Sequence, residues 1–331
     1  MTNILLSQSL YTEELTDSLD PLFPQMVHRL TDGGAHVRVG VRTIPEVLVR
    51  MLWQDSQLTS DIRAAMGKSQ RTGFIFSCGN VSWFGHDPKI GDKSQLNLLS
   101  MLPMGGTQIL GGYLANQLGR FDYISSDGTS CISSMHALFL ADLLIKAGKL
   151  DTVVVVSTDN ALAPEYLRIF GENGISKSLA EESDPNCRKF HLSQGVNVTV
   201  LTGLECSAKA ELLGIAVTAE QHATPLGIRE DGAGYRAAIT EALADASLTP
   251  DMIDFVKPHA TNTADNAIES QVINSIFGEI RAVSYKEQIG HTMGVSGIIE
   301  TNKAIEEHKG VFLSLSAGMG NVFAGAVVRV L

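Results

Sequence analysis

Apolar and polar residues follow one another in a pattern that predicts alternating strands and helices, and one segment shows this most clearly. A β-rich run at 123–126 is broken by an Asp-Gly turn, and a long apolar helix is predicted from near Cys131 to Gly148. The helix is apolar on more than one face, which is typical of a buried helix, and Gly148 suits a helix C-cap. A second apolar strand follows at once, at 152–156.

Similar segments occupy most of the remaining chain. Strands are predicted at 3–10, 71–76, 196–205, 213–217, 253–256, 282–286, 311–315 and 324–331, and helices at 43–66, in the second half of 101–119, and at 235–246, 266–277 and 293–308. Strands that alternate with helices and are often wholly apolar indicate an α/β protein whose sheets are covered on both faces.

The same plan of strands and helices occurs twice along the chain. We therefore expect two similar halves, at 1–160 and 196–331, joined by an irregular polar loop at 161–195. The first half carries the Cys131 segment. The repeat lies in the pattern of elements and not in the residue identities.

Composition bounds the kind of protein. The chain has 331 residues, of which 44% are hydrophobic, so it can bury a substantial core. A net charge of -11 argues against nucleic acid or an anionic membrane as the main partner, although a local basic patch can still face an acidic partner. No apolar run approaches the roughly 18 residues of a membrane span, and no signal-peptide pattern is evident. We expect a soluble cytoplasmic protein.

The four cysteines show no paired Cys-x-x-Cys spacing, so neither a zinc site nor a disulfide framework is predicted, and no cofactor is expected. Cys131 is the one of chemical interest. At a helix N-terminus, free N–H groups and the helix dipole favour negative charge. At such a position the pKa of a cysteine thiol, about 8.5 in the reference state, can be lowered toward 7. The alternative is that Cys131 is a small buried hydrophobic residue, as most free cysteines are.

Three polar side chains are predicted at or just after strand ends, namely Cys131, His259 and His291. Ligands and catalytic groups of open α/β sheets gather at such positions. A cysteine with two histidines from separate strand ends is a plausible nucleophile with acid–base partners. Each histidine alone is more often structural, but the set indicates a catalytic site.

Four stretches together form a more specific pattern. They are Ser130-Cys131-Ile132-Ser133-Ser134, His259-Ala260-Thr261-Asn262-Thr263 with Glu269 downstream, Lys286-x-x-x-Gly290-His291-x-x-Gly294-x-x-Gly297, and Gly318-Met319-Gly320-Asn321. From about residue 70 to its end, the chain resembles the β-ketoacyl-acyl-carrier-protein synthases, condensing enzymes of the thiolase-like superfamily. The glycine loop does not fit a dinucleotide site, because a strand and not a helix follows it.

The resemblance implies a five-layered αβαβα fold of two similar lobes and a decarboxylative condensation. Cys131 would carry an acyl group taken from an acyl carrier protein. His259 and His291 would polarise the carbonyl of a malonyl-type thioester and stabilise the enolate. Lys286 and Glu269 would pair and adjust the histidines. Substrate would contact Thr261, Thr263, Gly318, Met319, Gly320 and Asn321, and no metal is implied.

The chain also departs from the family pattern. Ser130 replaces the usual alanine, Ala260 the usual glycine, and Met319 stands where a gating phenylalanine is common. Cys187-Arg188-Lys189-Phe190 is similar to a family motif but continues with His191. The chain is short near 80–100 and 157–195, which favours a specialised polyketide or fatty-acyl pathway.

Two other functions stay open at this point. One is an acyltransferase of the same fold that forms an ester or amide. The other is a non-catalytic partner subunit, similar to a chain-length factor. The resemblance also implies a homodimer or a heterodimer with a second synthase-like chain, in which Ile109, Leu110 and Tyr123 would lie at the interface or the pocket wall, or in the ordinary core.

Overall fold

The computed structural model describes residues 2–11, 49, 52–79, 107–159, 170–177, 189–263 and 265–331. Several features considered above lie outside the described residues. These are the predicted loop near 80–100, most of the connecting segment, Cys187, and all but one residue of the predicted helix before residue 52.

The first half of the chain forms a mixed five-stranded arrangement with the order β3-β2-β4-β5-β1. Strands β2, β3 and β4 are parallel, and β5 runs antiparallel to both β4 and β1. The strands are β1 (Thr2–Tyr11), β2 (Thr72–Ser77), β3 (Tyr123–Asp127), β4 (Thr152–Thr158) and β5 (Gly195–Thr202).

The second half repeats this arrangement with the order β8-β7-β9-β10-β6. Counted along the chain, the strands of each half lie side by side in the order third, second, fourth, fifth and first. The fifth strand of the second half, β10, again runs antiparallel to both of its neighbours. The strands are β6 (Ala210–Ala219), β7 (Phe255–Lys257), β8 (Arg281–Ala282), β9 (Gly310–Gly318) and β10 (Val322–Val330). The expected two similar lobes are confirmed.

The two lobes meet through β1 and β6, which pair antiparallel and join the ten strands of the described residues into one sheet. Because β5 pairs with β4 and β1, it belongs to the first lobe. We therefore place the division between the lobes after Thr202 and not at residue 196. Only the neighbours of β5 in space reveal this, since its own sequence reads as an apolar strand in either lobe.

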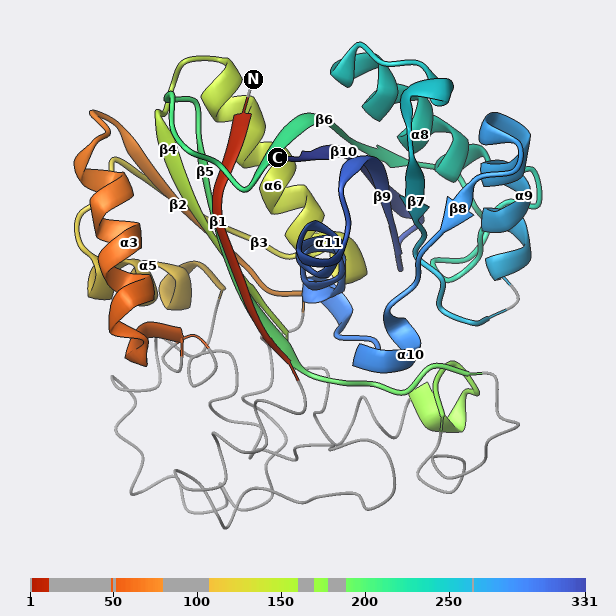
Figure 1. The fold of residues 1–331 in the computed structure, drawn as a ribbon. Coiled ribbons are helices and arrows are strands. Elements are labelled where there is room, and N and C mark those ends of the chain that lie inside the picture. Colours follow the sequence, from red (N-terminus) through yellow and green to blue (C-terminus); the bar gives the residue numbers. More distant parts are fainter. Residues whose placement is uncertain are drawn as a thin grey trace, which may run out of the picture.

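Helices lie outside each lobe and between the two lobes, so helices and strands alternate in the five layers seen in Figure 1. Helices α3 and α5 cover the outer face of the first lobe, α6 and α11 lie between the lobes, and α8 and α9 cover the outer face of the second lobe. Their bounds are α3 (Ser56–Gly67), α5 (Thr107–Leu118), α6 (Ser133–Lys146), α8 (Ala233–Ala246), α9 (Asp265–Phe277) and α11 (Ser296–Glu307).

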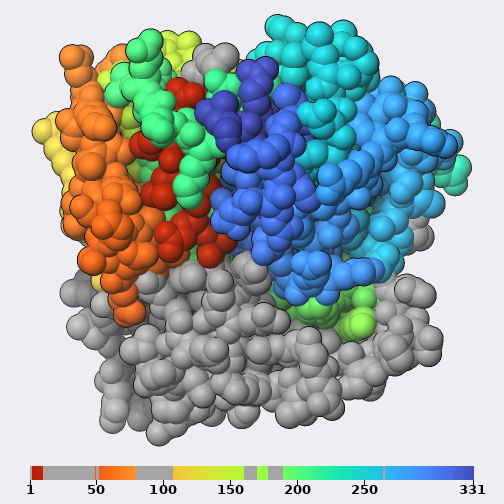
Figure 2. Space-filling view, in the orientation of Figure 1, coloured from red at the N-terminus to blue at the C-terminus, as the bar shows by residue number. Residues whose placement is uncertain are grey.

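Alternate residues of the central strands enter different cores, which explains why these strands are apolar throughout. Val154 and Val156 of β4 pack in the outer core of the first lobe, whereas Val153 and Val155 pack between the lobes. Successive side chains of a strand point to opposite faces, so a strand covered on both faces needs apolar residues at every position. The surface view in Figure 2 shows the two lobes lying against each other.

The helix that begins after Cys131 crosses the middle of the molecule and packs closely on α11. A Cβ added at Gly297 would lie 2.5 Å from Met135 Cγ, so only glycine allows this approach of the two helices. Gly148, with a φ of 62°, ends the helix region as predicted, because its N–H bonds back to the Ile145 carbonyl.

One predicted strand is shorter than expected. Strand β8 covers only Arg281–Ala282, and Lys286 instead begins the one-turn helix α10 (Lys286–Ile289). His291 therefore follows a helical turn and not a strand end directly. In the part of the chain that the structure describes, no helix is long and apolar enough to cross a membrane.

Candidate active site

Cys131 lies where the chain turns from β3 into α6, within the short helical turn Ser130–Ile132. Ser130 has a φ of 54°, a left-handed conformation that is uncommon for a residue with a side chain. The Ser133 hydroxyl donates to the Ser130 carbonyl oxygen at 2.6 Å and accepts the Thr129 N–H at 2.9 Å. The turn thus holds Cys131 immediately before the buried helix.

The environment of the Cys131 sulfur differs from the expectation. Only 6% of the residue is exposed, and this burial raises the pKa of the thiol to about 11. The Ser130 hydroxyl, 3.8 Å from the sulfur, lowers the pKa of the thiol in part, and Asp159 raises it further. The predicted lowering of the Cys131 pKa is therefore wrong, because desolvation of the sulfur outweighs the helix start. The resting thiol is protonated and needs a base.

The glycine loop between β9 and β10 lies against the nucleophile. A Cβ added at Gly318 would lie 3.2 Å from the Cys131 amide nitrogen, and the backbone of Met319 hydrogen bonds the Cys131 sulfur. Gly320 and Asn321 have positive φ angles of 92° and 59°, and they donate hydrogen bonds to the segment at 225–227. The Gly320 N–H donates to the Pro225 carbonyl at 2.7 Å, and Asn321 Nδ2 donates to the Gly227 carbonyl at 2.6 Å. Gly318 and Met319 therefore face the site, while Gly320 and Asn321 anchor the loop.

His259 lies in a tight loop after β7. Glu269, reaching from α9, accepts the His259 N–H at 2.6 Å and the Ala260 N–H at 2.9 Å. Ala260 and Asn262 have φ angles of 48° and 61°, a left-handed conformation that is uncommon for residues with a side chain, so the loop turns tightly here. The Glu269 carboxylate thus fixes the backbone of the His259 loop.

His291 is placed by the turn that follows α10. Its N–H donates to the His191 carbonyl at 2.8 Å, and its own carbonyl accepts the Ser193 N–H at 3.1 Å. The His291 ring lies edge-on to Phe190 with centroids 4.9 Å apart, and edge-on to the His259 ring at 5.5 Å. The two histidines, which come from different motifs of the second lobe, are thereby neighbours.

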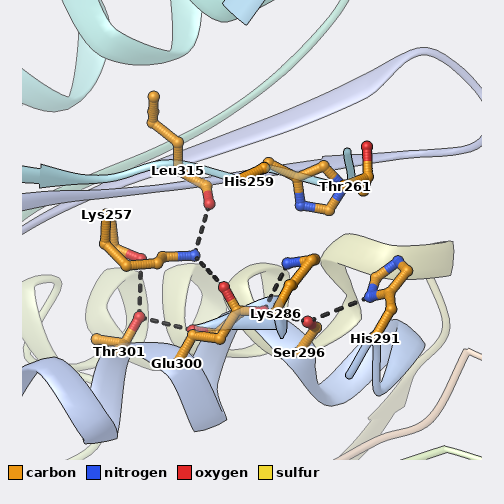
Figure 3. A network of polar contacts seen from close by, with 12 residues as sticks. Lys257, His259, Thr261, Lys286, His291, Ser296, Glu300, Thr301 and Leu315 are labelled. Atoms are coloured by element: carbon orange, nitrogen blue, oxygen red, sulfur yellow. Dashed lines mark hydrogen bonds and ion pairs between the residues drawn. The ribbon is translucent and has the colours of Figure 1, made fainter. Parts of the chain in front are cut away.

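Lys286 does not pair with Glu269, and this prediction is wrong. Lys286 Nζ lies 2.5 Å from Glu300 Oε1 on α11, while Lys257 Nζ lies 3.3 Å from Glu300 Oε2 (Figure 3). Lys257 also donates to the Leu315 carbonyl at 2.8 Å. Glu269 is engaged by the loop amides, so the central helix supplies the carboxylate that both lysines bind.

The lysine–glutamate cluster continues to His291 through a serine. Ser296 Oγ lies 2.5 Å from Glu300 Oε1 and 3.2 Å from His291 Nδ1 (Figure 3). Burial opposes the charge on Glu300, but Lys257 and Lys286 outweigh it, and the pKa of the carboxyl falls to about 2. Glu300 is therefore ionised at the centre of the network.

Both histidines are neutral near pH 7. Burial, and then Lys286, lower the pKa of His259 well below its usual value and that of His291 to about 3. A neutral imidazole carries one N–H donor and one acceptor nitrogen. Each ring can therefore either donate to a substrate oxygen or accept a proton, according to which nitrogen carries the hydrogen.

A single pocket with a volume of about 300 Å³ brings Cys131, His259 and His291 together. Thr261 and Thr263, whose hydroxyl oxygens lie 2.9 Å apart, also line it. The remaining lining residues are largely apolar and include Phe170, Ile175, Phe190, Leu226, Ile228, Ala317 and Met319. The pocket can hold an apolar chain whose reactive end meets one sulfur and two imidazoles.

Several residues around this pocket were not expected from the sequence. Glu300, Ser296 and Lys257 were not singled out, although Ser296 and Glu300 are four residues apart in a predicted helix and so share one face of it. Asp159, after β4, accepts the Gly294 N–H at 2.7 Å and ties the first lobe to the His291 motif. Within the described ranges, no group of three or more His, Cys, Asp or Glu side chains could hold a metal ion.

Comparison with known proteins agrees with this geometry. Residues 209–309 match the family profile described as beta-ketoacyl synthase, C-terminal domain. A chloroplastic 3-oxoacyl-[acyl-carrier-protein] synthase I of Hordeum vulgare is 30% identical over 226 residues, which cover 62% of this chain and 48% of the relative. The pikromycin polyketide synthase component PikAII of Streptomyces venezuelae is 30% identical over 221 residues, 60% of this chain and 6% of the relative.

Solved structures are similar to this chain in fold. A ketosynthase of Xenorhabdus doucetiae, in complex with its chain length factor, superimposes with a TM-score of 0.74 at 19% identity and covers 100% of this chain and 98% of its own. A β-ketoacyl synthase of Burkholderia phymatum does so with a TM-score of 0.72 at 16% identity, covering 100% and 99%. The fold is thiolase-like, although the chain spans only about half the length of the Hordeum relative. With its matched C-terminal domain, the chain is a divergent, β-ketoacyl synthase-like protein.

Proposed function

We propose that the protein is a β-ketoacyl synthase that condenses an acyl group held on Cys131 with a malonyl-type thioester, with loss of carbon dioxide. The observation that carries the proposal is the shared pocket of Cys131, His259 and His291. The relatives named above, which act on acyl carrier proteins or belong to polyketide synthases by name, support this substrate class. The acyl donor is then a phosphopantetheine thioester on an acyl carrier protein.

In the first half-reaction, the Cys131 sulfur attacks the acyl thioester carbonyl and the carrier thiol leaves. The backbone N–H groups of Cys131 and Met319 are proposed to hold the oxyanion, since Gly318 lets the loop approach the Cys131 amide. The acyl chain then lies along the apolar wall of the pocket.

In the second half-reaction, the malonyl-type thioester binds with its carbonyl at the histidine pair, and its carboxylate leaves as carbon dioxide. An N–H donor aimed at this oxygen stabilises the enolate as it forms. The enolate carbon attacks the acyl carbonyl on Cys131 and forms the new carbon–carbon bond. The released Cys131 thiolate takes up one proton, which the decarboxylative reaction consumes. Thr261 and Thr263 are proposed to bind the pantetheine amides at the pocket wall.

The decisive test is the mass of the intact protein after incubation with acyl carrier proteins. We expect a mass increase equal to the acyl group in the native protein and its complete loss in Cys131→Ala. An adduct that persists on Cys131→Ala would refute the proposal. Release of carbon dioxide from a malonyl carrier protein separates a condensing enzyme from an acyltransferase of the same fold, which would release none.

A second candidate is a chain-length-factor-like subunit of a heterodimer. It is favoured by the likeness to a ketosynthase solved with its chain length factor. Strand β3 lies at the edge of the sheet, its residue Ile124 is 45% exposed, and Ile109 of the adjacent α5 is 50% exposed, so this edge is proposed as the dimer contact. Leu110 is 2% exposed and belongs to the core instead. No turnover by the purified chain, with turnover restored by a second synthase-like chain, would support this candidate.

A further inference from the structure

We propose that Ser296 is a positioning residue that keeps the proton of His291 on Nδ1, so that Nε2 can accept the thiol proton of Cys131. The inference rests on the proposed function and assigns different tasks to the two histidines. It stands on the hydrogen-bond chain from His291 through Ser296 to Glu300 (Figure 3).

The direction of this chain follows from the single hydrogen of a serine hydroxyl. Ser296 Oγ has two possible acceptors, Glu300 Oε1 at 2.5 Å and His291 Nδ1 at 3.2 Å. An ionised carboxylate can only accept, and hydrogen bonds to ionised groups are the shorter and stronger ones. Ser296 therefore donates to Glu300. The contact with His291 then requires that Nδ1–H donates to the serine oxygen.

Two lysines keep Glu300 in the form that this direction needs. Lys286 Nζ bonds Oε1 at 2.5 Å and Lys257 Nζ reaches Oε2 at 3.3 Å, and the three side chains are 0–2% exposed. Protonation of Glu300 would leave two buried ammonium groups without their carboxylate, which is strongly unfavourable. Glu300 therefore stays a hydrogen-bond acceptor, and the Ser296 hydroxyl continues to donate to it.

With Nδ1 occupied by the proton, Nε2 of His291 carries a lone pair. His291 lines the same pocket as the buried Cys131 thiol. That thiol keeps its proton at neutral pH, since burial raises its pKa to about 11. A neutral imidazole with a free nitrogen can accept this proton in the same step in which the sulfur attacks, so no free thiolate has to form beforehand.

His259 has the complementary arrangement. Its Nδ1 is buried and has no hydrogen-bond partner within the described part of the chain. With the proton on Nδ1, the N–H group would have no acceptor, whereas on Nε2 it can donate to a substrate carbonyl. We therefore place the proton of His259 on Nε2. His259 is then the donor to the enolate oxygen. This differs from the expectation that both histidines polarise the substrate carbonyl.

The proton balance of acyl transfer closes on these atoms. The S–H bond of Cys131 breaks and its proton bonds to His291 Nε2, while the sulfur attacks the acyl thioester carbon. The carrier sulfur leaves with the bonding electron pair and takes the proton from Nε2. His291 returns to its starting tautomer, and no oxidant or further reactant is needed.

The tautomer can be measured without turnover. In protein labelled with ¹⁵N-histidine, long-range ¹H–¹⁵N spectra distinguish protonated Nδ1 from protonated Nε2, and loss of signals in His291→Asn assigns the ring. We expect Nδ1–H in the native protein and a shift to Nε2–H in Ser296→Ala. Native His291 protonated on Nε2 would overturn the proposal.

The rate of Cys131 acylation by a hexanoyl-pantetheine thioester gives the second readout. We expect Ser296→Ala to slow single-turnover acylation at least about tenfold, a part of the 10²–10⁴-fold that general bases contribute. Ser296→Thr, which keeps a hydroxyl, should recover most of the rate. Ser314→Ala is the matched control, since its buried hydroxyl bonds Thr301 at 2.8 Å and no histidine. Equal rates for Ser296→Ala and Ser314→Ala would refute the inference.

The two readouts separate this inference from the proposed function. Absence of any acyl adduct on the native protein would remove the proposed function, and with it the role of His291 as the base. A native protein that acylates normally with His291 protonated on Nε2 would leave the synthase proposal standing and remove only the role of Ser296.

Discussion

Lys286 Nζ lies 2.5 Å from Glu300 Oε1, and the two side chains are 2% and 1% exposed. Lys257, 0% exposed, binds the other oxygen of the same carboxylate. One glutamate therefore holds two buried lysines beneath the histidine pair, and the stability of the protein should depend on it.

We expect Glu300→Gln to lower the free energy of unfolding by about 3 kcal/mol, because removing one partner of a buried ion pair leaves an uncompensated charge. Denaturant titration of the purified protein measures this. Glu307→Gln is the control on the same helix, because the Glu307 side chain is 42% exposed where it pairs with Lys303 at 3.1 Å. Such a pair contributes at most about 1 kcal/mol. Equal losses for the two variants would show that Glu300 is not central.

The protein should lose stability already between pH 7 and pH 5, at pH values above those at which most carboxylates titrate. The pKa of His291 is lowered to about 3 in the folded protein, whereas an unfolded histidine titrates near 6.5. Between these values the unfolded chain binds the extra proton, so stability falls as the pH is lowered through this window. For His291 alone the loss between pH 7 and pH 5 is about 2 kcal/mol.

Denaturant unfolding at several pH values tests this. His291→Asn, which cannot take up a proton at this position, should flatten the dependence between pH 7 and pH 5. The contribution of Glu300, whose pKa is about 2, lies below about pH 4.5 and does not interfere. An unchanged slope in His291→Asn would contradict a histidine held neutral by burial.

Much of the fold follows from the sequence because burial leaves a local signature. The apolar strands β2 and β4 and the all-round apolar α6 read directly as elements covered on both sides. The motifs placed Cys131, His259 and His291 at one site because each falls on a turn that the sheet topology brings together. These features depend on neighbours along the chain.

What the sequence did not reveal depends on contacts across the chain. The choice of Lys286 between Glu269 and Glu300 depends on how α9 and α11 pack, and both carboxylates lie at plausible distances along the sequence. The raised pKa of Cys131 depends on how completely the turn is covered. The place of β5 in the first lobe depends on its pairing with β1, which lies more than a hundred residues earlier in the chain.

The accessibility of the cysteines should follow their burial. Cys206 is exposed, whereas Cys131 is buried and burial raises its pKa to about 11. Iodoacetamide at pH 7.5 should therefore modify Cys206 before Cys131, and the rate at Cys131 should still rise above pH 9.5, because the thiolate is the reactive form. Peptide mass spectrometry reads each site. A rate at Cys131 that levels off below pH 8 would contradict a protonated resting thiol.

The approach of the glycine loop to the nucleophile gives the last prediction. A methyl group at Gly318 would lie 3.2 Å from the Cys131 amide nitrogen and 3.4 Å from that of Ile132. It would crowd the amide proposed to hold the oxyanion. We expect Gly318→Ala to slow acylation of Cys131 about 10²-fold, the size of effect seen when one oxyanion donor is lost. Gly112→Ala, in α5, is the matched control, because its Cβ would meet nothing within 4 Å. That variant should keep the native rate and gain up to about 1 kcal/mol in stability from higher helix propensity. If Gly318→Ala acylates at the native rate and its free energy of unfolding is unchanged, this loop does not form the oxyanion site.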